Sequence, residues 1–80
     1  MAIVIFSSEL QKLTGEEQTQ VNSKVYKDIV TEITNRYSAL EHDELMKMAV
    51  AIDGEIIHTP FLEKVASSSE LHFLYRIAGG

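Results

Sequence analysis

The chain has 80 residues, of which 45% are hydrophobic and 24% are charged, as expected for one folded domain rather than a disordered chain. Twelve acidic and seven basic residues give a net charge of −5, which excludes the basic stripe of a nucleic-acid-binding protein and disfavours binding to an anionic membrane surface. The lack of cysteine excludes a disulfide framework, a zinc–thiolate site and a cysteine nucleophile.

We expect residues 1–80 to form a single cytoplasmic domain. No stretch approaches the about 20 consecutive apolar residues of a membrane span. The apolar start of the chain lacks the basic residues and the small-residue cleavage site of a signal peptide.

The first part of the chain predicts two paired strands. Residues 2–7 are apolar and β-branched, which favours a buried strand. Thr14-Gly15 is a turn signal. Residues 17–21 alternate polar side chains with Thr19 and Val21, which predicts the hairpin partner of the first strand.

The next segment predicts the main helix of the domain. Asn22 and Ser23 precede it as possible caps, and Glu32 and Arg36 form an i, i+4 charge pair on its polar side. Its apolar face has the spacing of one side of a helix and consists of Tyr26, Ile29, Val30, Ile33 and Tyr37.

The second half of the chain predicts a polar loop followed by three strands. Residues 41–44 form the loop, and residues 46–52 form a strand that turns back at Asp53-Gly54, a strong hairpin signal. The return strand covers residues 55–58 and ends at Thr59-Pro60.

One helical turn at residues 61–65 and a loop at residues 67–69 precede the last strand, which covers residues 70–77. Alternation along this strand divides its side chains between two faces. One face carries Leu71, Phe73, Tyr75 and Ile77, and the other carries Glu70, His72, Leu74 and Arg76.

The predicted order, β-β-α-β-β-β, indicates an α+β protein with a β-grasp, or ubiquitin-like, roll. Its mixed sheet has one main helix packed on one face, and the final strand lies between the two hairpins, parallel to the first strand.

No enzyme site of its own is expected in this chain. The three histidines, His42, His58 and His72, share no metal-ligand spacing, so we predict no metal site and no stably bound cofactor. Asp53 could suggest a catalytic aspartate, but its role in the Asp53-Gly54 turn explains it fully. The charged run 41–44 is typical of a solvated loop rather than a weak metal site.

The remaining candidate is the final Gly79-Gly80. A frayed terminus or a cloning remnant would explain it, but two glycines at a chosen position occur by chance in roughly one chain in two hundred. Without a Cβ atom, this pair can thread a narrow channel in another protein. A carboxylate at Gly80 could be activated by ATP to an acyl-adenylate and then converted by a sulfur nucleophile to a thiocarboxylate.

The chain resembles the bacterial sulfur carriers that include the small subunit of molybdopterin synthase and the thiamine-biosynthesis sulfur carrier. The resemblance covers nearly the whole chain. Its markers are the strand at residues 3–6, Glu9-Leu10, Thr14-Gly15, the hairpin Val50-Ala51-Ile52-Asp53-Gly54-Glu55, Thr59-Pro60, Glu70-Leu71-His72-Phe73-Leu74 and the ending Ile77-Ala78-Gly79-Gly80.

This resemblance implies that an E1-like adenylyltransferase uses ATP to adenylate Gly80. A cysteine desulfurase or another sulfurtransferase would supply sulfur, and the large subunit of molybdopterin synthase, or another enzyme, would accept it. Ala78 and Gly79 would thread the channel. Because the last strand leads into this tail, we expect its end to dock the partner, through Phe73, Leu74, Tyr75, Arg76 and Ile77.

Two departures from the molybdopterin subunit bear on partner choice. Tyr75-Arg76 replaces its usual Pro-Pro, and residues 67–69 replace its Asp-Gly-Asp. The sequence leaves open a carrier for thiamine or another sulfur metabolite, a ubiquitin-like modifier joined through Gly80, and a plain interaction module.

Overall fold

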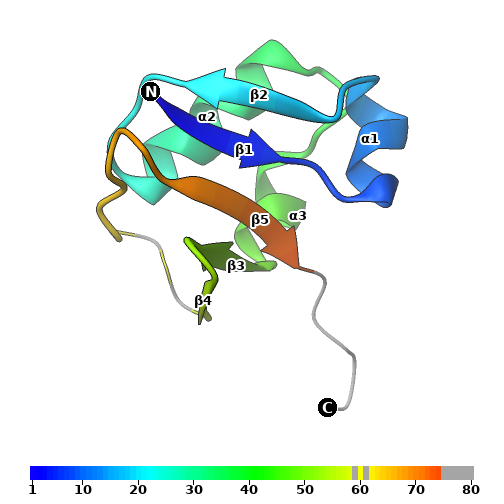
Figure 1. Ribbon diagram of the computed structural model, residues 1–80. Helices are drawn as coiled ribbons and strands as arrows, with labels where there is room; N and C mark the ends of the chain where they lie inside the picture. The colour runs from blue at the N-terminus through cyan, green and yellow to red at the C-terminus, as the bar shows by residue number, and fades with distance from the viewer. Residues whose placement is uncertain (59, 61, 75–80) are drawn as a thin grey trace.

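The structure is a computed structural model, and it describes residues 1–58, 60 and 62–74. One five-stranded mixed sheet carries the fold, in the order β2-β1-β5-β3-β4 (Figure 1). In chain order the elements are β1 (Ala2–Ile5), α1 (Ser8–Thr14), β2 (Gln18–Val21), α2 (Tyr26–Arg36), α3 (His42–Met46), β3 (Ala49–Ile52), β4 (Glu55–Ile57) and β5 (Glu70–Leu74).

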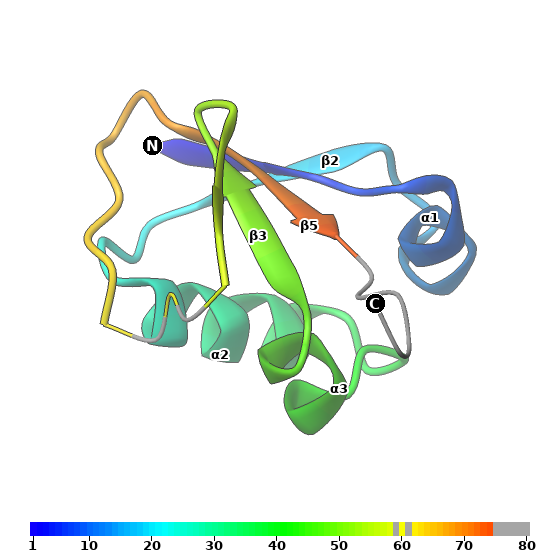
Figure 2. The ribbon, with the colours of Figure 1, turned by 90° about the horizontal axis from the view of Figure 1, so that it is seen from below.

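The position of β5 confirms the predicted topology. It lies in the middle of the sheet, parallel to β1 and antiparallel to β3. Its buried residues Leu71 and Phe73 stand opposite Val4 of β1 and Val50 of β3, respectively. Both α2 and α3 lie on one side of the sheet, and α1 lies at the end where β1 finishes (Figure 2).

The core fills the space between the sheet and α2. All four predicted core positions of the helix itself, Tyr26, Ile29, Val30 and Ile33, are buried. The ring of Tyr26 lies 5.9 Å from that of Phe73, measured between centroids. Residues of β1, β3 and β5 supply the other side of this core, and along β1 and β5 the buried residues alternate as the strand period requires.

Helix α1 occupies the segment that was predicted to hold only a turn. Ser7 caps its first turn, where the Ser7 hydroxyl oxygen accepts a hydrogen bond from the Leu10 N–H at 3.5 Å. Gly15 ends the helix in the left-handed conformation, with φ at 74°, and its N–H bonds the Gln11 carbonyl. The turn signal at Gly15 was therefore a helix C-cap, and the two strands are joined by a helix rather than by a tight hairpin.

Helix α3 replaces the predicted polar loop at residues 41–44. Leu45 anchors it in the core at 2% exposure, and Asp43 and Glu44 place negative charge in its first turn, where the helix dipole favours it. The following strand is shorter than predicted, because residue 46 belongs to α3 and β3 begins at Ala49.

The predicted caps of α2 have a different role. Val25 is the N-cap and makes no side-chain cap bond. Instead the backbone N–H groups of Asn22 and Ser23 and the Ser23 hydroxyl donate to the Glu32 carboxylate at 2.9–3.0 Å, and Arg36 donates to it at 2.9 Å. Burial of this carboxylate opposes its ionisation, but these hydrogen bonds and the Arg36 charge outweigh burial and lower the pKa of Glu32. Glu32 therefore ties the β2–α2 connection to the helix.

The segment before β5 also differs from its prediction. Lys64 forms an isolated antiparallel bridge with Val25, and the Tyr26 N–H donates to the Glu63 carbonyl at 2.9 Å. Residues 63 and 64 therefore pair in an extended conformation, whereas the helical turn was predicted to continue to residue 65. A turn bond does form just before them, from the Glu63 N–H to the Pro60 carbonyl at 2.6 Å. Within the described residues, no helix is both long and apolar enough to cross a membrane.

Candidate functional site at the end of strand β5

The described part of β5 brings the chain to the start of the predicted tail. Residues 75–80, which include the predicted docking residues Tyr75, Arg76 and Ile77, the threading residues Ala78 and Gly79, and the reactive Gly80, lie outside the described residues. Phe73 and Leu74 are described, and they face opposite sides of the sheet.

Phe73 belongs to the core. It is 2% exposed and packs against Tyr26, so its side chain offers no surface to a partner, which corrects its place among the predicted docking residues. Leu74 is half-buried on the other face and stands opposite Ala49 of β3. Of these two neighbours, Leu74 alone is placed to contact a docked protein.

A row of side chains crosses the sheet on the face that α2 leaves open. His72 is exposed at its centre, between Ile5 of β1 and Ala51 of β3, which are both half-buried. Ala51 in turn stands opposite Ile56 of β4, which is 56% exposed. We call Ile5, Ala51, Ile56, His72 and Leu74 the open face.

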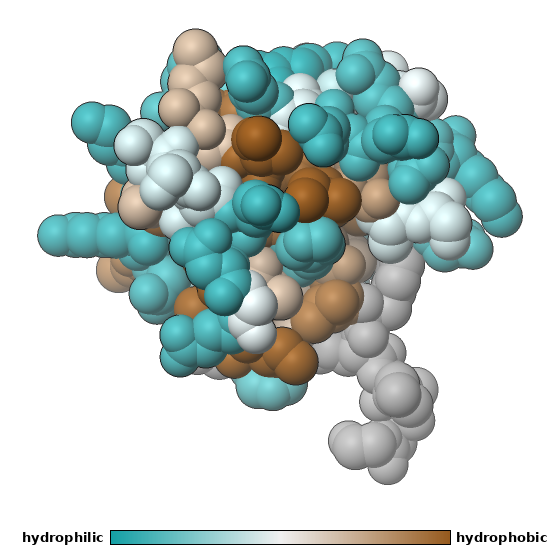
Figure 3. Space-filling view, viewed as in Figure 1, coloured by the Kyte–Doolittle hydropathy of each residue, from teal (hydrophilic) through white to brown (hydrophobic). Residues whose placement is uncertain are grey.

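Figure 3 shows this side of the molecule, with apolar side chains gathered near its middle among polar ones. Apolar side chains exposed together among polar ones are typical of a protein-binding surface. Through Leu74, the open face is continuous with the end of β5.

The start of β5 is held by Asp53 in the β3–β4 turn. Its carboxylate accepts hydrogen bonds from the Ser69 hydroxyl at 2.7 Å and from the Glu70 N–H at 3.0 Å. These bonds, the Glu70 N–H first, lower the pKa of Asp53. The Asp53 N–H donates to the Glu70 carbonyl at 2.9 Å, and the Ser69 carbonyl accepts from the Ile3 N–H at 3.0 Å. We call this set of hydrogen bonds around Asp53, Ser69 and Glu70 the latch, and it fixes the start of β5 to both neighbouring strands, β1 and β3.

The latch adds a role that the sequence did not reveal. Asp53 has φ at 51° and Gly54 at 83°, which confirms the predicted two-residue turn. The turn signal explained Asp53 completely, and nothing in the spacing indicated that its carboxylate would reach Ser69. Among the residues that the structure describes, no group of three or more His, Asp or Glu side chains could hold a metal ion.

No family model matches this sequence, and no curated protein matches it. Solved structures do match its fold. A chain of the BexX/CysO complex of Amycolatopsis orientalis aligns over 100% of both chains with a TM-score of 0.84 and 19% identity. The small archaeal modifier protein 1 (SAMP1) of Methanosarcina acetivorans aligns over 99% of this chain and 95% of its own, with a TM-score of 0.76 and 21% identity.

SAMP1 of Haloferax volcanii aligns over 99% of this chain and 98% of its own, with a TM-score of 0.69 and 17% identity. The agreement spans nearly the whole of each chain, so the similarity applies to the fold as a whole. The chain therefore has the β-grasp fold of these proteins, as its sequence predicted.

Proposed function

We propose that the protein is a sulfur carrier whose reactive group is the carboxylate of Gly80. The observation that carries the proposal is the Gly79-Gly80 pair, which follows a few residues after the last strand of a β-grasp fold. The fold supplies a body that a partner can recognise, and the two glycines supply an unhindered end that can enter the partner's active site.

The chemistry needs no catalytic side chain from the carrier. An oxygen of the Gly80 carboxylate attacks the α-phosphate of ATP on an E1-like adenylyltransferase, and pyrophosphate leaves. The outer sulfur of a cysteine persulfide, held by a sulfurtransferase or a cysteine desulfurase, then attacks the acyl carbon, and AMP leaves. A second thiol breaks the sulfur–sulfur bond, which frees the thiocarboxylate and leaves a disulfide on the donor.

The thiocarboxylate would deliver its sulfur in cofactor biosynthesis in the cytoplasm, with the large subunit of molybdopterin synthase as the first acceptor to test. The length of the chain supports this acceptor, because 80 residues suit the small subunit of molybdopterin synthase better than the shorter thiamine carrier. An enzyme of thiamine synthesis, or of another sulfur metabolite, is the next acceptor to test.

A ubiquitin-like modifier, joined through Gly80 to protein amines, is the second candidate. The observation that favours it is the similarity in fold to two proteins that are named archaeal modifiers. The two functions share the activation step and differ in the acceptor, so they separate only after Gly80 has been adenylated.

The test is the intact mass of the untagged protein, made in cells with its own activating enzyme. We expect a species in which sulfur has replaced one oxygen, and we expect it to disappear when Gly80 is deleted. Adducts of higher molecular weight that also require Gly80 would favour the modifier instead. A single unmodified mass, with no adenylate when ATP and the enzyme are supplied, would reject both functions.

A further inference from the structure

The sheet has a second feature at the end where β5 finishes. Helix α1 and helix α3 lie on either side of this end (Figure 2), and between them is a groove of about 580 Å³. Met48 lines the groove and precedes Ala49, the residue that stands opposite Leu74. The groove therefore lies next to the point from which the chain leads into its last six residues.

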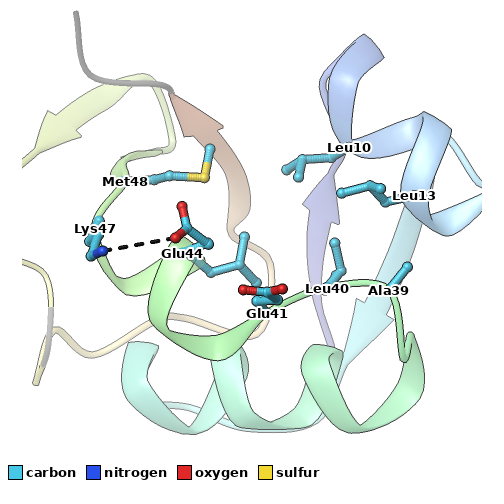
Figure 4. Close-up of a pocket in the computed structure, with 9 residues that line it drawn as sticks. Leu10, Leu13, Ala39, Leu40, Glu41, Glu44, Lys47 and Met48 are labelled. Atoms are coloured by element: carbon cyan, nitrogen blue, oxygen red, sulfur yellow. Dashed lines mark ion pairs between the residues drawn. The ribbon is translucent and has the colours of Figure 1, made fainter. Parts of the chain in front are cut away.

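The floor of the groove is apolar and well packed. Leu10 and Leu45 are 2% exposed, Leu40 is 5% exposed and Met48 is 6% exposed. Leu13 stands at the rim on α1 with 48% exposure, and it points with Leu10 toward Met48 (Figure 4). A partly exposed leucine above a buried apolar floor leaves room for one more apolar side chain.

The opposite rim is acidic. Glu41 and Glu44 line the groove, and Asp43 beside them has a 94% exposed side chain. Lys47 is the basic residue on this rim, and it contacts Glu44 at 3.8 Å with both side chains at least two-thirds exposed. An ion pair in such a setting is weak, so Glu44 can exchange Lys47 for a cation of a partner.

We infer that this groove binds a segment of a partner protein that presents an apolar side chain flanked by lysine or arginine. The acidic rim selects for the basic flanks, and the apolar floor selects for the anchor. A second copy of this chain is a poor occupant, because the net charge of −5 would set one acidic rim against another acidic molecule.

The position of the groove identifies the partner, on the basis of the proposed function, as the enzyme that activates Gly80. A protein that holds the tail in its active site has this groove within reach, at the same end of the sheet. An enzyme that bound the groove and the tail at the same time would fix the direction from which the tail enters its active site.

The groove is tested first without the enzyme. The probe is a synthetic peptide, Ac-Lys-Arg-Leu-Leu-Lys-Arg-amide, titrated into the 15N-labelled full chain and followed by NMR. We expect shift changes to gather at the amides of α1 and residues 39–48, and to weaken with added salt. A control peptide with serine in place of both leucines should bind about tenfold more weakly.

Two outcomes of this titration would reject the groove. In one, the serine peptide binds as well as the leucine peptide, so charge alone holds it. In the other, shift changes are absent or spread over the whole acidic surface. The double variant Glu41→Lys, Glu44→Lys should lose the peptide, whereas Glu16→Lys, Glu55→Lys, which changes exposed acids outside the groove lining, should keep it.

The link to activation is tested with kinetics of ATP-dependent adenylation. Leu13→Ser should raise the KM for the carrier about tenfold and leave kcat unchanged, because it removes a contact outside the chemistry. Leu62→Ser is the matched control, since Leu62 is 66% exposed and does not line the groove. An unchanged KM for Leu13→Ser would reject the enzyme as the occupant. Absence of adenylation in the wild-type chain would instead reject the proposed function, while the peptide titration still decides the groove.

Discussion

The two faces of the sheet are built from the same strands and differ in what covers them. One face is sealed by α2, and its side chains, such as Val4, Val50 and Leu71, have no exposed surface. The other face carries Ile5, Ala51 and Leu74 half-buried, and among the described residues no helix covers this side of the sheet (Figure 2). Alternation along β1 and β5 separates the two sets, and in β3 Ala49, on the side of Leu74, is buried as well. Stability should therefore depend on the covered face, and partner binding on the open face.

The largest expected effect is on the covered face. Ile33 is 0% exposed on α2, so Ile33→Ala should lower the free energy of unfolding by about 2–4 kcal/mol through lost burial and a residual cavity. Urea denaturation measures this loss. Where the variant is still folded, we expect adenylation at the wild-type rate. If the folded Ile33→Ala protein were adenylated slowly, the covered face would also contribute to function, which would contradict this assignment of roles to the two faces.

The covered face is also the part that could be predicted from sequence. The spacing of Tyr26, Ile29, Val30 and Ile33 matches a helix of three turns, and the alternation in β5 matches a strand with one buried face. These patterns extend over enough residues to be distinguished from chance. The central place of β5 then followed from the order of the elements.

The end of the sheet could not be predicted in the same way. Helices α1 and α3 have seven and five residues, too few for a periodic pattern and too short to be stable alone. Tertiary contacts of Leu10 and Leu45 hold them in place, and such contacts are not visible in a linear sequence. The spacing of Ser7 and Gly15 is a cap signal at both ends of α1, and it could have identified that helix. The groove, which lies between these two helices, was consequently missed.

On the open face, Leu74→Asp should reduce the catalytic efficiency of adenylation about tenfold, because a charge would be desolvated where an apolar contact is expected. Because Leu74 is half-buried, the free energy of unfolding of the Leu74→Asp variant should be measured as well. Leu62→Asp supplies the same change on an exposed leucine outside the open face. Normal adenylation of a well-folded Leu74→Asp variant would exclude the open face from docking.

The next effect is smaller and concerns the edge between β2 and α2. Glu32→Gln should lower the free energy of unfolding at neutral pH by about 1–2 kcal/mol, because Arg36 loses its partner charge and the N–H groups of Asn22 and Ser23 lose a charged acceptor. The pKa of Glu32 is lower in the folded chain than its ordinary value of 4.5. The unfolded chain therefore takes up the proton first, and this stabilisation is complete above that value and lost as the pH falls through the folded pKa.

Urea titrations of the wild type and Glu32→Gln between neutral and acidic pH measure this dependence. We expect the gap between the two proteins to close as the pH falls. A gap that stays constant down to strongly acidic pH would show that the carboxylate charge is not the source of the effect.

The smallest effect should appear at the end of the sheet, where α1 borders the groove. Gly15 has φ at +74°, and a Cβ atom added there would meet nothing within 4 Å, so Gly15→Ala has only a backbone cost of about 1 kcal/mol. Gly15→Asn should cost less, because asparagine tolerates this conformation. Hydrogen exchange of the α1 amides, compared with those of β5, distinguishes local fraying from global destabilisation. We expect the loss to be confined to α1, since the core beneath α2 does not depend on this cap. Equal loss of protection in β5 would mean that the end of the sheet and its covered face unfold as one unit, and that the groove is as rigid as the core.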